Sequence, residues 1–575
     1  MGLQLVERLI RHATERPTAE AVRQIGLDGA APRILTYQQV EMSSRALAAC
    51  IGGEVGPGSV VLVCFPNQIE CILSIVAALR AGATVFPVHP NLTDVELKAA
   101  ALHSRAAGVI GSSRAVEVLR ELGLREFDCS EPRSSGRAES HGPERPPGLP
   151  LTLRVKGSKS AARQETPRGD AIDGVDGENT ALLLQSSGTT GRPHIVKRSG
   201  PSLDAVARNV AVSVGLRPND RVLGLIPACH SYGVENLILG PVWAGACVHL
   251  CPVPDAATAV SQVSNGGITI FPGVPSMFEM IGRLAGDGCR ATTLRRAYSA
   301  GANLPLAVFE TFERRLGVRI GQIYGMTEIG SVTFNDPDEK DHDPMSVGRP
   351  MDGVAIRIVD PTSRAVQAEV SMPAELPGEP RTCSPLPEGS RAVRPEFPCR
   401  ESPRDLKIAA RWGGESRSAA RHSCEGEVAV SAPSMLTGYL REEDGACVAP
   451  CELVHGFFLT GDLGRLDERR RLTITGRRKL VIDVGGLKVN LLEVEAALNS
   501  HEDVRECAVT GVQVSETVAR LKAFIVPKDL KKPPAAEALR AYLRSRFSAY
   551  KVPRAFELRE ALPKSATGKL LRHKL

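Results

Sequence analysis

Short apolar runs that alternate with longer amphipathic stretches are the feature that most restricts the fold. The run at residues 59–64 follows a Pro-Gly turn and is rich in β-branched residues, which predicts a strand. Residues 69–81 predict a helix that ends at Gly82, and residues 84–88 predict the next strand. Strands that alternate with helices are typical of a parallel α/β sheet. The same pattern returns in later predicted strands, at residues 221–227, 246–252 and 268–271.

The length of the chain and a change of pattern near residue 480 indicate two domains. A single hydrophobic core rarely grows to the size that 575 residues would require. After residue 480, short predicted strands accompany two predicted helices, which is typical of a small α+β domain with its own core. We therefore expect an α/β fold: a large, multi-layer N-terminal domain with parallel sheets at residues 1–478 and a small mobile α+β domain at residues 479–575.

Two stretches interrupt the alternation, at about residues 130–179 and 362–425. Both are rich in Arg, Pro, Ser and Glu and poor in apolar residues. A segment of this composition buries too little apolar surface to offset the entropy lost when it is ordered. We interpret both stretches as flexible surface insertions in the large domain.

Composition argues against two classes of partner. Aromatic residues make up 4% of the chain and the net charge is only +6, so we expect no nucleic acid partner. The longest apolar run, at residues 71–79, is far too short to cross a membrane, and the N-terminus lacks a signal-peptide pattern. We expect a cytoplasmic protein with no integral membrane segment, whose 14 cysteines are reduced.

Three potential metal ligands alternate along one predicted strand. Cys247, His249 and Cys251 would share a face of that strand and could bind a metal ion. The sequence offers no fourth ligand nearby, and cysteine is common in buried strands as a small apolar residue. We therefore interpret the three as residues of a buried strand.

The most informative motif is a loop of small residues directly after an apolar run. Residues 182–193 read LLLQSSGTTGRP. The two glycines allow a tight turn whose N–H groups converge on an anion, and the hydroxyls add donors. No Gly-Lys-Ser/Thr follows, so the loop is not the P-loop of NTPases. We expect it to bind phosphate through six residues: Ser186, Ser187, Gly188, Thr189, Thr190 and Gly191.

The second motif, at residues 322–330, reads QIYGMTEIG. Tyr324 offers an aromatic platform for a base, and Thr327 and Glu328 follow it closely. One carboxylate is enough for Mg²⁺, because phosphates and water fill its remaining positions. The small-residue turn at 299–302 would let a planar base approach the backbone. This pattern predicts a nucleotide platform beside a metal-binding carboxylate.

Two more motifs lie further along the chain. Residues 459–495 contain Asp462 directly after a glycine at a predicted strand end, where a ribose-binding carboxylate is often found. Residues 562–570 read LPKSATGKL and place Lys569 after a glycine on a predicted loop. A lone lysine in such a place is normally a solvated charge, so its interpretation depends on the other motifs.

Together and in this order, the four motifs resemble the adenylate-forming (AMP-binding) superfamily, which includes acyl-CoA synthetases, peptide-synthetase adenylation domains and beetle luciferases. The resemblance covers nearly the whole chain outside the two insertions and includes matches at residues 35–37, 426–427, 438–439 and 549–553. It implies an acid–thiol ligase of the acyl-CoA synthetase branch. Such an enzyme uses ATP to convert a carboxylic acid to acyl-AMP and pyrophosphate, and then transfers the acyl group to a thiol.

The resemblance implies a role for each matching residue. Residues 186–191 would surround the β- and γ-phosphates of ATP. Glu328 would hold Mg²⁺, Thr327 would contact the α-phosphate, and Lys569 would bridge that phosphate and the substrate carboxylate. The nucleoside would be held by Tyr324 stacked on adenine, by Gly301 and Ala302 lining the adenine pocket, and by Asp462 with Arg477 on the ribose.

The resemblance also implies a change of conformation between the two half-reactions. Lys479 occupies the hinge position about which the small domain would rotate after adenylation. That rotation would remove Lys569 and bring Gly485 and Gly486 to the site, where they would leave a channel for a pantetheine arm.

One position departs from the family pattern. A lysine usually follows the proline that ends the phosphate loop, and His194 stands there instead, with Lys197 and Arg198 close behind. A neutral histidine supplies less positive charge than lysine near pH 7. Either Lys197 substitutes for the missing charge or the loop closes less firmly on phosphate.

The acid and the acceptor follow from two further features. His230 stands where amino-acid-activating relatives typically have an Asp for the α-ammonium, so we expect a fatty, aryl or other acid without an α-amino group. Its pocket should be apolar and include the catalytic His230 together with Tyr232, Val234, Met326, Ile329 and Gly330. No carrier domain follows Lys569, so we expect free CoA as acceptor, with the phosphopantetheine of a separate acyl carrier protein as the alternative.

Two other classes of function stay open at this stage. One is a luciferase-like oxidoreductase that uses the adenylate with oxygen. The other is an inactive nucleotide-binding relative. Only His194 favours this alternative, because the other expected residues, Thr327, Glu328, Asp462 and Lys569, are all present.

Overall fold

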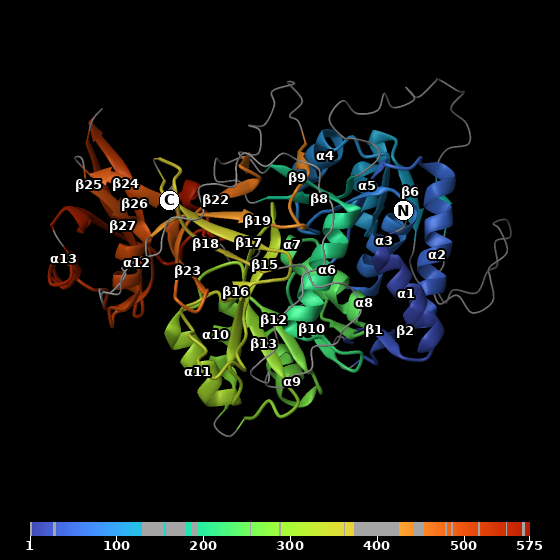
Figure 1. Ribbon diagram of the computed structural model, residues 1–575, viewed down its shortest axis with the longest axis horizontal. Helices are drawn as coiled ribbons and strands as arrows, with labels where there is room; N and C mark the ends of the chain where they lie inside the picture. The colour runs from blue at the N-terminus through green and yellow to red at the C-terminus, as the bar shows by residue number, and fades with distance from the viewer. Residues whose placement is uncertain are drawn as a thin grey trace, which may run out of the picture.

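The computed structural model runs from the N-terminal layers on the right of Figure 1 to the C-terminal residues, in orange and red, on the left. The residues that the structure describes are 3–26, 30–128, 154–156, 180–186, 194–252, 255–286, 289–361, 363–372, 425–440, 453–477, 480–484, 487–515, 518–547, 549–565 and 570–575.

The first sheet has eight strands in the order β20-β9-β8-β4-β3-β5-β6-β7. Its centre is parallel, and antiparallel pairs form at both edges. The strands are β3 (Val60–Cys64), β4 (Thr84–Pro87), β5 (Gly108–Gly111), β6 (Arg125–Asp128), β7 (Arg154–Lys156), β8 (Thr180–Gln185), β9 (Ile195–Ser199) and β20 (Gly438–Tyr439).

The second sheet has nine strands in the order β16-β15-β14-β13-β12-β10-β11-β1-β2. Its six central strands are parallel from β14 to β1. The strands are β1 (Glu20–Gln24), β2 (Arg33–Thr36), β10 (Arg221–Gly224), β11 (Cys247–Leu250), β12 (Ile270–Gly273), β13 (Arg296–Ser299), β14 (Ile320–Met326), β15 (Gly330–Asn335) and β16 (Arg349–Pro350).

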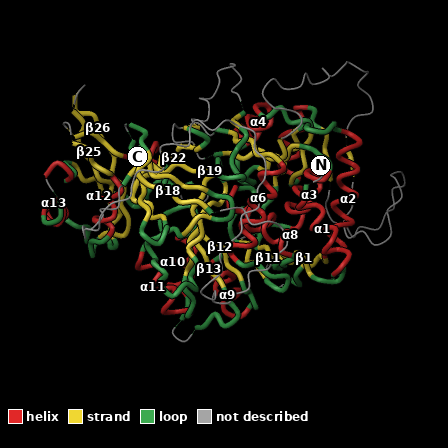
Figure 2. The backbone as a smooth tube through the Cα atoms, in the orientation of Figure 1, coloured by secondary structure: helices red, strands yellow, loops and turns green. Residues whose placement is uncertain are grey.

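Helices gather beside these sheets on the right of Figure 2, whereas strands fill the centre. In chain order the helices are α1 (Gln4–Glu15), α2 (Tyr37–Glu54), α3 (Ile69–Arg80), α4 (Asp94–His103), α5 (Ser113–Leu119), α6 (Gly200–Val214), α7 (Ser231–Gly233), the π-helix η2 (Val234–Leu239), α8 (Gly240–Ala244), α9 (Ala256–Asn265), α10 (Pro275–Leu284) and α11 (Leu306–Leu316).

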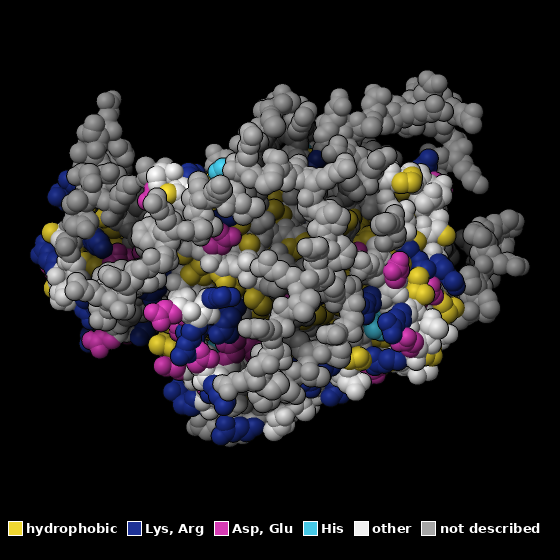
Figure 3. Space-filling view, viewed as in Figure 1, with side chains coloured by type: hydrophobic (Ala, Val, Ile, Leu, Met, Phe, Trp, Pro, Cys, Tyr) yellow, Lys and Arg dark blue, Asp and Glu magenta, His cyan; other side chains and the backbone are white. Residues whose placement is uncertain are grey.

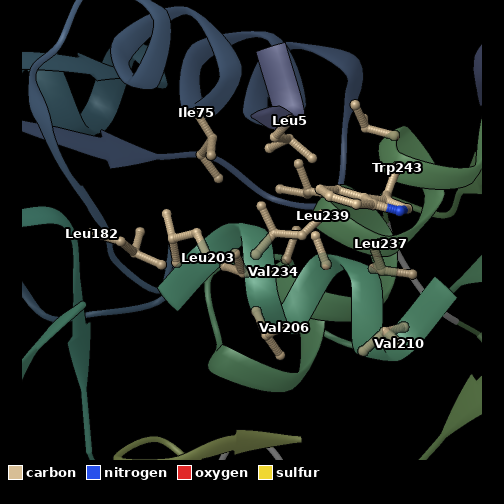
Figure 4. Packing of buried hydrophobic residues seen from close by; sticks show 14 of the residues in the cluster. Leu5, Ile75, Leu182, Leu203, Val206, Val210, Val234, Leu237, Leu239 and Trp243 are labelled. Carbon is tan, nitrogen blue, oxygen red and sulfur yellow. The ribbon is translucent and has the colours of Figure 1, made fainter. Parts of the chain in front are cut away.

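The alternation of side chains along each strand divides the core into layers. Val61 and Val63 of β3 join the cluster that also contains Val222 of β10, so helices between the two sheets connect them. Figure 4 shows this packing, with Leu5 of α1, Ile75 of α3 and Trp243 of α8 directed toward the side chains of α6 and η2. Val60 and Leu62 face α4 and α5, and Leu223 and Phe271 face α9 to α11. The sequence-based expectation of a multi-layer α/β fold is confirmed.

A third, antiparallel sheet lies between these layers and the C-terminal residues (Figure 1). Its strands are β17 (Ala355–Val359), β18 (Val366–Ser371), β19 (Gly426–Ser431), β21 (Leu453–Val454), β22 (Phe457–Leu466) and β23 (Leu472–Arg477). The small domain that follows has a core of its own. Its elements are β24 (Val481–Val484), β25 (Leu487–Asn490), α12 (Leu491–Asn499), β26 (Val504–Ser515), β27 (Val518–Pro527), α13 (Ala536–Arg544) and β28 (Ala555–Leu558).

Two short segments within the predicted insertions form strands. Within the second stretch, Val366–Ser371 forms β18 and pairs with β17, and within the first, Arg154–Lys156 forms β7 and pairs with β6. Backbone pairing with an existing strand ordered these short segments without a large apolar surface of their own. Most of the remainder of both stretches lies outside the described residues.

The visible surface carries charges of both signs. In Figure 3, basic and acidic side chains are interspersed below the centre of the molecule, over the region of β23, α10 and α11. The ion pairs of the structure include Arg471–Asp467 (2.7 Å) and Arg296–Asp336 (2.7 Å). Within the described part of the chain, every helix is too short or too polar to cross a bilayer.

Candidate active site

A buried tyrosine and a buried aspartate join two sheets. Tyr324 lies near the end of β14 in the nine-stranded sheet, and Asp462 lies in β22 of the antiparallel sheet. The phenolic hydroxyl of Tyr324 donates a hydrogen bond of 2.7 Å to Oδ2 of Asp462, whose side chain is only 4% exposed. The backbone N–H of Asp462 in turn donates to Oγ1 of Thr460 (3.1 Å), which fixes the carboxylate in place.

Arg477 supplies the countercharge to this carboxylate. Strand β23 pairs with β22 so that Arg477 lies opposite Asp462, and its Nε donates to Oδ1 at 2.6 Å. Burial alone would lower the pKa of Arg477, but Asp462 and Tyr324 raise it above its ordinary value. The guanidinium therefore stays charged and neutralises the buried aspartate.

The hydroxyl of Tyr324 remains a donor. Burial, reinforced by the charge of Asp462, raises the pKa of Tyr324 well above its ordinary value. A carboxylate has about four lone-pair sites, so Asp462 can accept hydroxyl donors from a ligand in addition to Tyr324 and Arg477. This is what binding the two hydroxyls of a ribose requires.

Thr327 and Glu328 lie in the turn that connects β14 to β15, directly after the strand that carries Tyr324. The segment at residues 434–440 supports this turn. The N–H of Leu436 donates to the carbonyl of Glu328 (2.7 Å), and the hydroxyl of Ser434 donates to the carbonyl of Ile329 (2.7 Å). The hydroxyl of Tyr439 donates to Oε1 of Glu328 at 3.5 Å.

The same segment connects the Glu328 turn to the ends of the phosphate loop. Strand β20 pairs with β9, which follows the loop, so that Tyr439 lies opposite Val196. The ring of Tyr439 lies 5.7 Å from the ring of His194, at an interplanar angle of 59°. The N–H of Ser186 donates to the carbonyl of His194 (2.8 Å), which brings the two ends of the loop together. The predicted phosphate loop therefore begins and ends beside the predicted metal carboxylate.

A buried ion pair lies behind the Glu328 turn. Arg198 on β9 is 1% exposed, and its Nη1 lies 3.7 Å from Oε1 of Glu235 in η2 and donates to the carbonyl of Thr327 at 3.3 Å. Glu235 also accepts from the hydroxyl of Ser231 (3.0 Å), and from the N–H (3.0 Å) and hydroxyl (2.6 Å) of Ser331. Burial lowers the pKa of Arg198, and Glu235 opposes that shift.

This pair touches the predicted acid pocket. A Cβ added to Gly330 would lie 3.1 Å from Nη2 of Arg198 and 3.2 Å from Oε1 of Glu235. Nη2 of Arg198 is shielded from solvent and has no hydrogen-bond partner among the described residues. Beside Gly330, one of the residues expected to line the acid pocket, the described residues therefore include a buried charged pair.

The remaining predicted residues divide into two groups. Gly301 has a φ of +84°, which favours glycine, and Gly301 and Ala302 are exposed at the turn after β13. His230 caps the N-terminus of α7 with extended backbone, and its carbonyl accepts the N–H of Val234 (2.8 Å). Nine predicted residues lie outside the described part of the chain: Ser187, Gly188, Thr189, Thr190 and Gly191 of the phosphate loop, and Lys479, Gly485, Gly486 and Lys569.

Sequence reasoning missed that Arg198 and Glu235 form a buried pair behind the Glu328 turn. Arg198 was interpreted only as a charge close behind His194. The sequence offers no local signal, because Arg198 stands in the run IVKRS beside a second basic residue and lies far from Glu235 in the chain.

Comparison with known proteins agrees with this geometry. The AMP-binding enzyme family matches residues 9–379, and the AMP-binding enzyme C-terminal domain matches residues 493–569. A long-chain-fatty-acid–CoA ligase of Bacillus subtilis (strain 168) is 27% identical over 570 residues, covering 94% of this chain and 89% of the relative.

Two solved structures share the fold. ATP-bound MatB from Rhodopseudomonas palustris superimposes with a TM-score of 0.75 at 20% identity, covering 100% of this chain and 98% of MatB. The o-succinylbenzoate CoA synthetase (MenE) from Bacillus subtilis, in complex with its acyl-adenylate OSB-AMP, has a TM-score of 0.71 at 21% identity, with coverage of 99% and 97%.

The chain therefore belongs to the AMP-binding enzyme family. Within it, the chain is an AMP-forming acid–thiol ligase of the acyl-CoA synthetase branch.

Proposed function

We propose that Tyr324, Asp462 and Arg477 hold the nucleoside of ATP while a carboxylic acid is adenylated, and that the acyl group then passes to CoA. The observation that carries this proposal is the buried carboxylate of Asp462, held by Tyr324 (2.7 Å) and Arg477 (2.6 Å) on the strand pair next to the Glu328 turn. A buried, fixed carboxylate with spare lone pairs suits the two hydroxyls of a ribose.

In the first step an oxygen of the substrate carboxylate attacks the α-phosphorus of ATP. A bond forms between that oxygen and phosphorus, and the bond from phosphorus to pyrophosphate breaks. Two anions meet in this step, so catalysis is mainly positioning and cancellation of charge. We assign Thr327 to the α-phosphate and Lys569 to the bridge between the phosphate and the carboxylate, as the resemblance implies. Charge-assisted hydrogen bonds of this kind contribute roughly 1.5–3 kcal/mol each.

Glu328 fits a role in holding Mg²⁺. It is partly exposed, it lies beside the ends of the phosphate loop, and its carboxylate faces the hydroxyl of Tyr439. One protein carboxylate matches the preference of Mg²⁺ for phosphate oxygens and water at its other positions. The ion would neutralise charge on the phosphates.

In the second step the thiol attacks the acyl carbonyl and AMP leaves. We assign the hinge to Lys479 and the channel for the pantetheine arm to Gly485 and Gly486. Free CoA is our proposed thiol, and the phosphopantetheine of a separate carrier protein is the alternative. The B. subtilis relative is named for CoA, which supports the first. We propose the cytoplasm as the compartment, because the reaction needs a reduced thiol.

The acid that we propose is a fatty, aryl or other acid that lacks an α-amino group. His230 stands at the position that implies the missing amino group. The Arg198–Glu235 pair behind Gly330 is 1% and 4% exposed, so its charges are enclosed by the protein and do not restrict the acid further.

An acid panel tests the proposal. Pyrophosphate release is measured for short dicarboxylic, aryl, long-chain and amino acids, with CoA, with a phosphopantetheinylated carrier protein, and with neither. We expect release with acids that lack the amino group, and thioester with CoA. The Lys569→Ala variant is the control for background release. Thioester with the carrier protein alone would replace CoA as acceptor, and the absence of acid-dependent release across the panel would contradict the proposal.

A further inference from the structure

Two adjacent strands bring a carboxylate, a thiol and an imidazole together away from the adenylation residues. Cys247 and His249 lie on one face of β11, and Glu20 is the first residue of β1, which pairs with β11 in parallel. Their potential ligand atoms all lie within 4.8 Å of one another, and Sγ of Cys247 is 4.0 Å from Oε2 of Glu20. Sequence reasoning grouped Cys251 with this set, but Cys251 packs in the apolar cluster with Leu223.

The imidazole provides an independent indication of a ligand. His249 is 5% exposed, and Nε2 is shielded from solvent with no hydrogen-bond partner among the described residues. Buried polar atoms are nearly always satisfied, so an unpartnered ring nitrogen indicates a missing partner. A metal ion bound to this nitrogen would be such a partner, because neutral imidazole is a common metal ligand.

The ligand set fits Zn²⁺. In a tetrahedral site, Zn–S and Zn–O bonds of about 2.3 and 2.0 Å place the sulfur and oxygen about 3.5 Å apart. The observed separation of 4.0 Å exceeds this by about 0.5 Å, which small side-chain rotations can supply. Sulfur, nitrogen and oxygen together suit Zn²⁺ better than the oxygen-seeking Mg²⁺ or Ca²⁺. The side chain of Glu20 is 39% exposed, so an ion can enter from solvent and keep water as its fourth ligand.

Two arginines lie near the cluster, and a bound cation must be compatible with their positive charge. Nη2 of Arg23 binds Oε1 of Glu20 at 2.6 Å, and its Nε binds Oε2 at 3.1 Å. An ion on Oε2 would leave the shorter bond intact, so Arg23 would orient the ligating carboxylate. Arg221 lies on the neighbouring strand opposite Cys247. Once the thiol has lost its proton, two negative ligands balance Zn²⁺, and the arginines face a centre without net charge.

We propose that Glu20, Cys247 and His249 form a Zn²⁺ site that ties β1 to β11 and is independent of ATP binding. On binding, the S–H bond of Cys247 breaks, its proton goes to solvent, and an S–Zn bond forms. The site would stabilise the edge of the nine-stranded sheet that carries the N-terminal strands.

Cobalt titration of the full chain tests this site. After treatment with a chelator, the protein is titrated with Co²⁺, and the thiolate-to-metal absorption, the visible bands and the proton release are recorded. We expect one Co²⁺ per chain with tetrahedral bands, one proton released per ion, and displacement by Zn²⁺. The thiolate band should be lost in Cys247→Ser, and affinity should fall at least about tenfold in His249→Gln.

The matched control is Cys251→Ser, directly after the end of β11, which should keep the full spectrum. Circular dichroism of each variant without metal checks that it is folded, and Glu20→Gln, a partly exposed change, serves if the buried variants unfold. An unchanged thiolate band in Cys247→Ser would place the ion on other cysteines and overturn the proposal. The absence of any stoichiometric binding by the wild-type chain would overturn it as well.

Discussion

The hydroxyl of Tyr324 and the carboxylate of Asp462, 138 residues apart in the chain, meet at 2.7 Å and join the nine-stranded sheet to the antiparallel sheet. Arg477 completes the group from the strand next to Asp462. The candidate ribose site therefore depends on two sheets keeping a fixed relative position. A shift of either sheet should therefore change the affinity for ATP.

The first prediction removes this hydroxyl. In Tyr324→Phe the buried carboxylate loses a donor, which costs about 1–1.5 kcal/mol, so the KM for ATP should rise about tenfold. The control is Tyr37→Phe, whose buried hydroxyl donates to the carbonyl of Ala246 (2.8 Å) away from the site. Steady-state pyrophosphate release gives KM, and urea denaturation gives stability. If both variants lose the same stability and neither changes the KM, Tyr324 has only a structural role.

Local signals in the sequence predict several of the elements, but not strands such as β18 that are ordered by pairing with a neighbour. The helix predicted at residues 69–81 is α3 (Ile69–Arg80), and Gly82 after it has a φ of +71°, as a helix-ending glycine requires. One of the short strands predicted after residue 480 lies within β26 (Val504–Ser515), which is longer because pairing with β27 extends it beyond its most apolar residues.

Contacts between distant segments could not be predicted from the sequence. Family resemblance placed Tyr324 and Asp462 at one nucleotide, but nothing in the residues indicates that they hydrogen-bond to each other. Arg198 and Glu235 each look like solvated charges in the sequence, and the fold brings them together as a buried pair at 3.7 Å. Glu20 and His249 are neighbours only because β1 lies beside β11.

The second prediction concerns the buried pair. In Arg198→Met, Glu235 keeps its charge without a countercharge, so unfolding free energy should fall by about 3–5 kcal/mol. Adding Glu235→Gln should restore most of this loss, since the amide oxygen still accepts from the N–H of Ser331 (3.0 Å). The exposed pair Arg11–Glu15 (2.8 Å) is the control, and Arg11→Met should cost at most about 1 kcal/mol. Urea denaturation compares the four proteins, and equal losses in Arg198→Met and Arg11→Met would contradict the prediction.

The third prediction concerns His194 at the end of the phosphate loop. A lysine there adds a permanent positive charge beside the predicted phosphate site, so His194→Lys should keep or lower the KM for ATP. Any gain should shrink at high salt, because screening weakens it. His194→Met, of similar length without charge, should show no gain. Loss of activity in a folded His194→Lys protein would mean that the ring contact with Tyr439, at 5.7 Å, has a specific role.

The fourth prediction concerns the long stretch between β18 and β19. Ser371 lies opposite Ala355 of β17, and Glu427 lies opposite Val359, so the strand ends that must be joined are about 20 Å apart. A Gly/Ser linker of about 12 residues can span this distance. We expect replacement of residues 373–424 by this linker to leave pyrophosphate release within about twofold.

The control deletion begins at residue 366 instead and also removes β18. This deletion should lower the stability of the protein, because β17 then loses its backbone hydrogen bonds to β18. Abolished activity in the first deletion, with the protein still folded, would show that the segment belongs to the catalytic machinery.

The last prediction separates the two half-reactions. In the proposed mechanism, the positive charge of Lys569 is needed while the carboxylate attacks the α-phosphorus, because that step brings two anions together. In the same mechanism, Gly486 is needed only when a thiol arm enters, because its proposed role is to leave space for that arm. Lys569→Ala should therefore nearly abolish acid-dependent pyrophosphate exchange and still convert a supplied acyl-adenylate to thioester. Gly486→Leu should exchange normally, accumulate adenylate and form little thioester.

Two controls make the crossed pattern decisive. Circular dichroism and thermal unfolding first show that both variants are folded, because replacing a glycine can itself cost stability. Lys564→Ala, in the same C-terminal motif, removes a charge that pairs with Glu506 (2.6 Å), and it should leave both half-reactions near the wild-type rates. Equal depression of both half-reactions in Lys569→Ala and in Gly486→Leu would mean that one conformation serves both steps, since the two-conformation mechanism requires each variant to spare one of them.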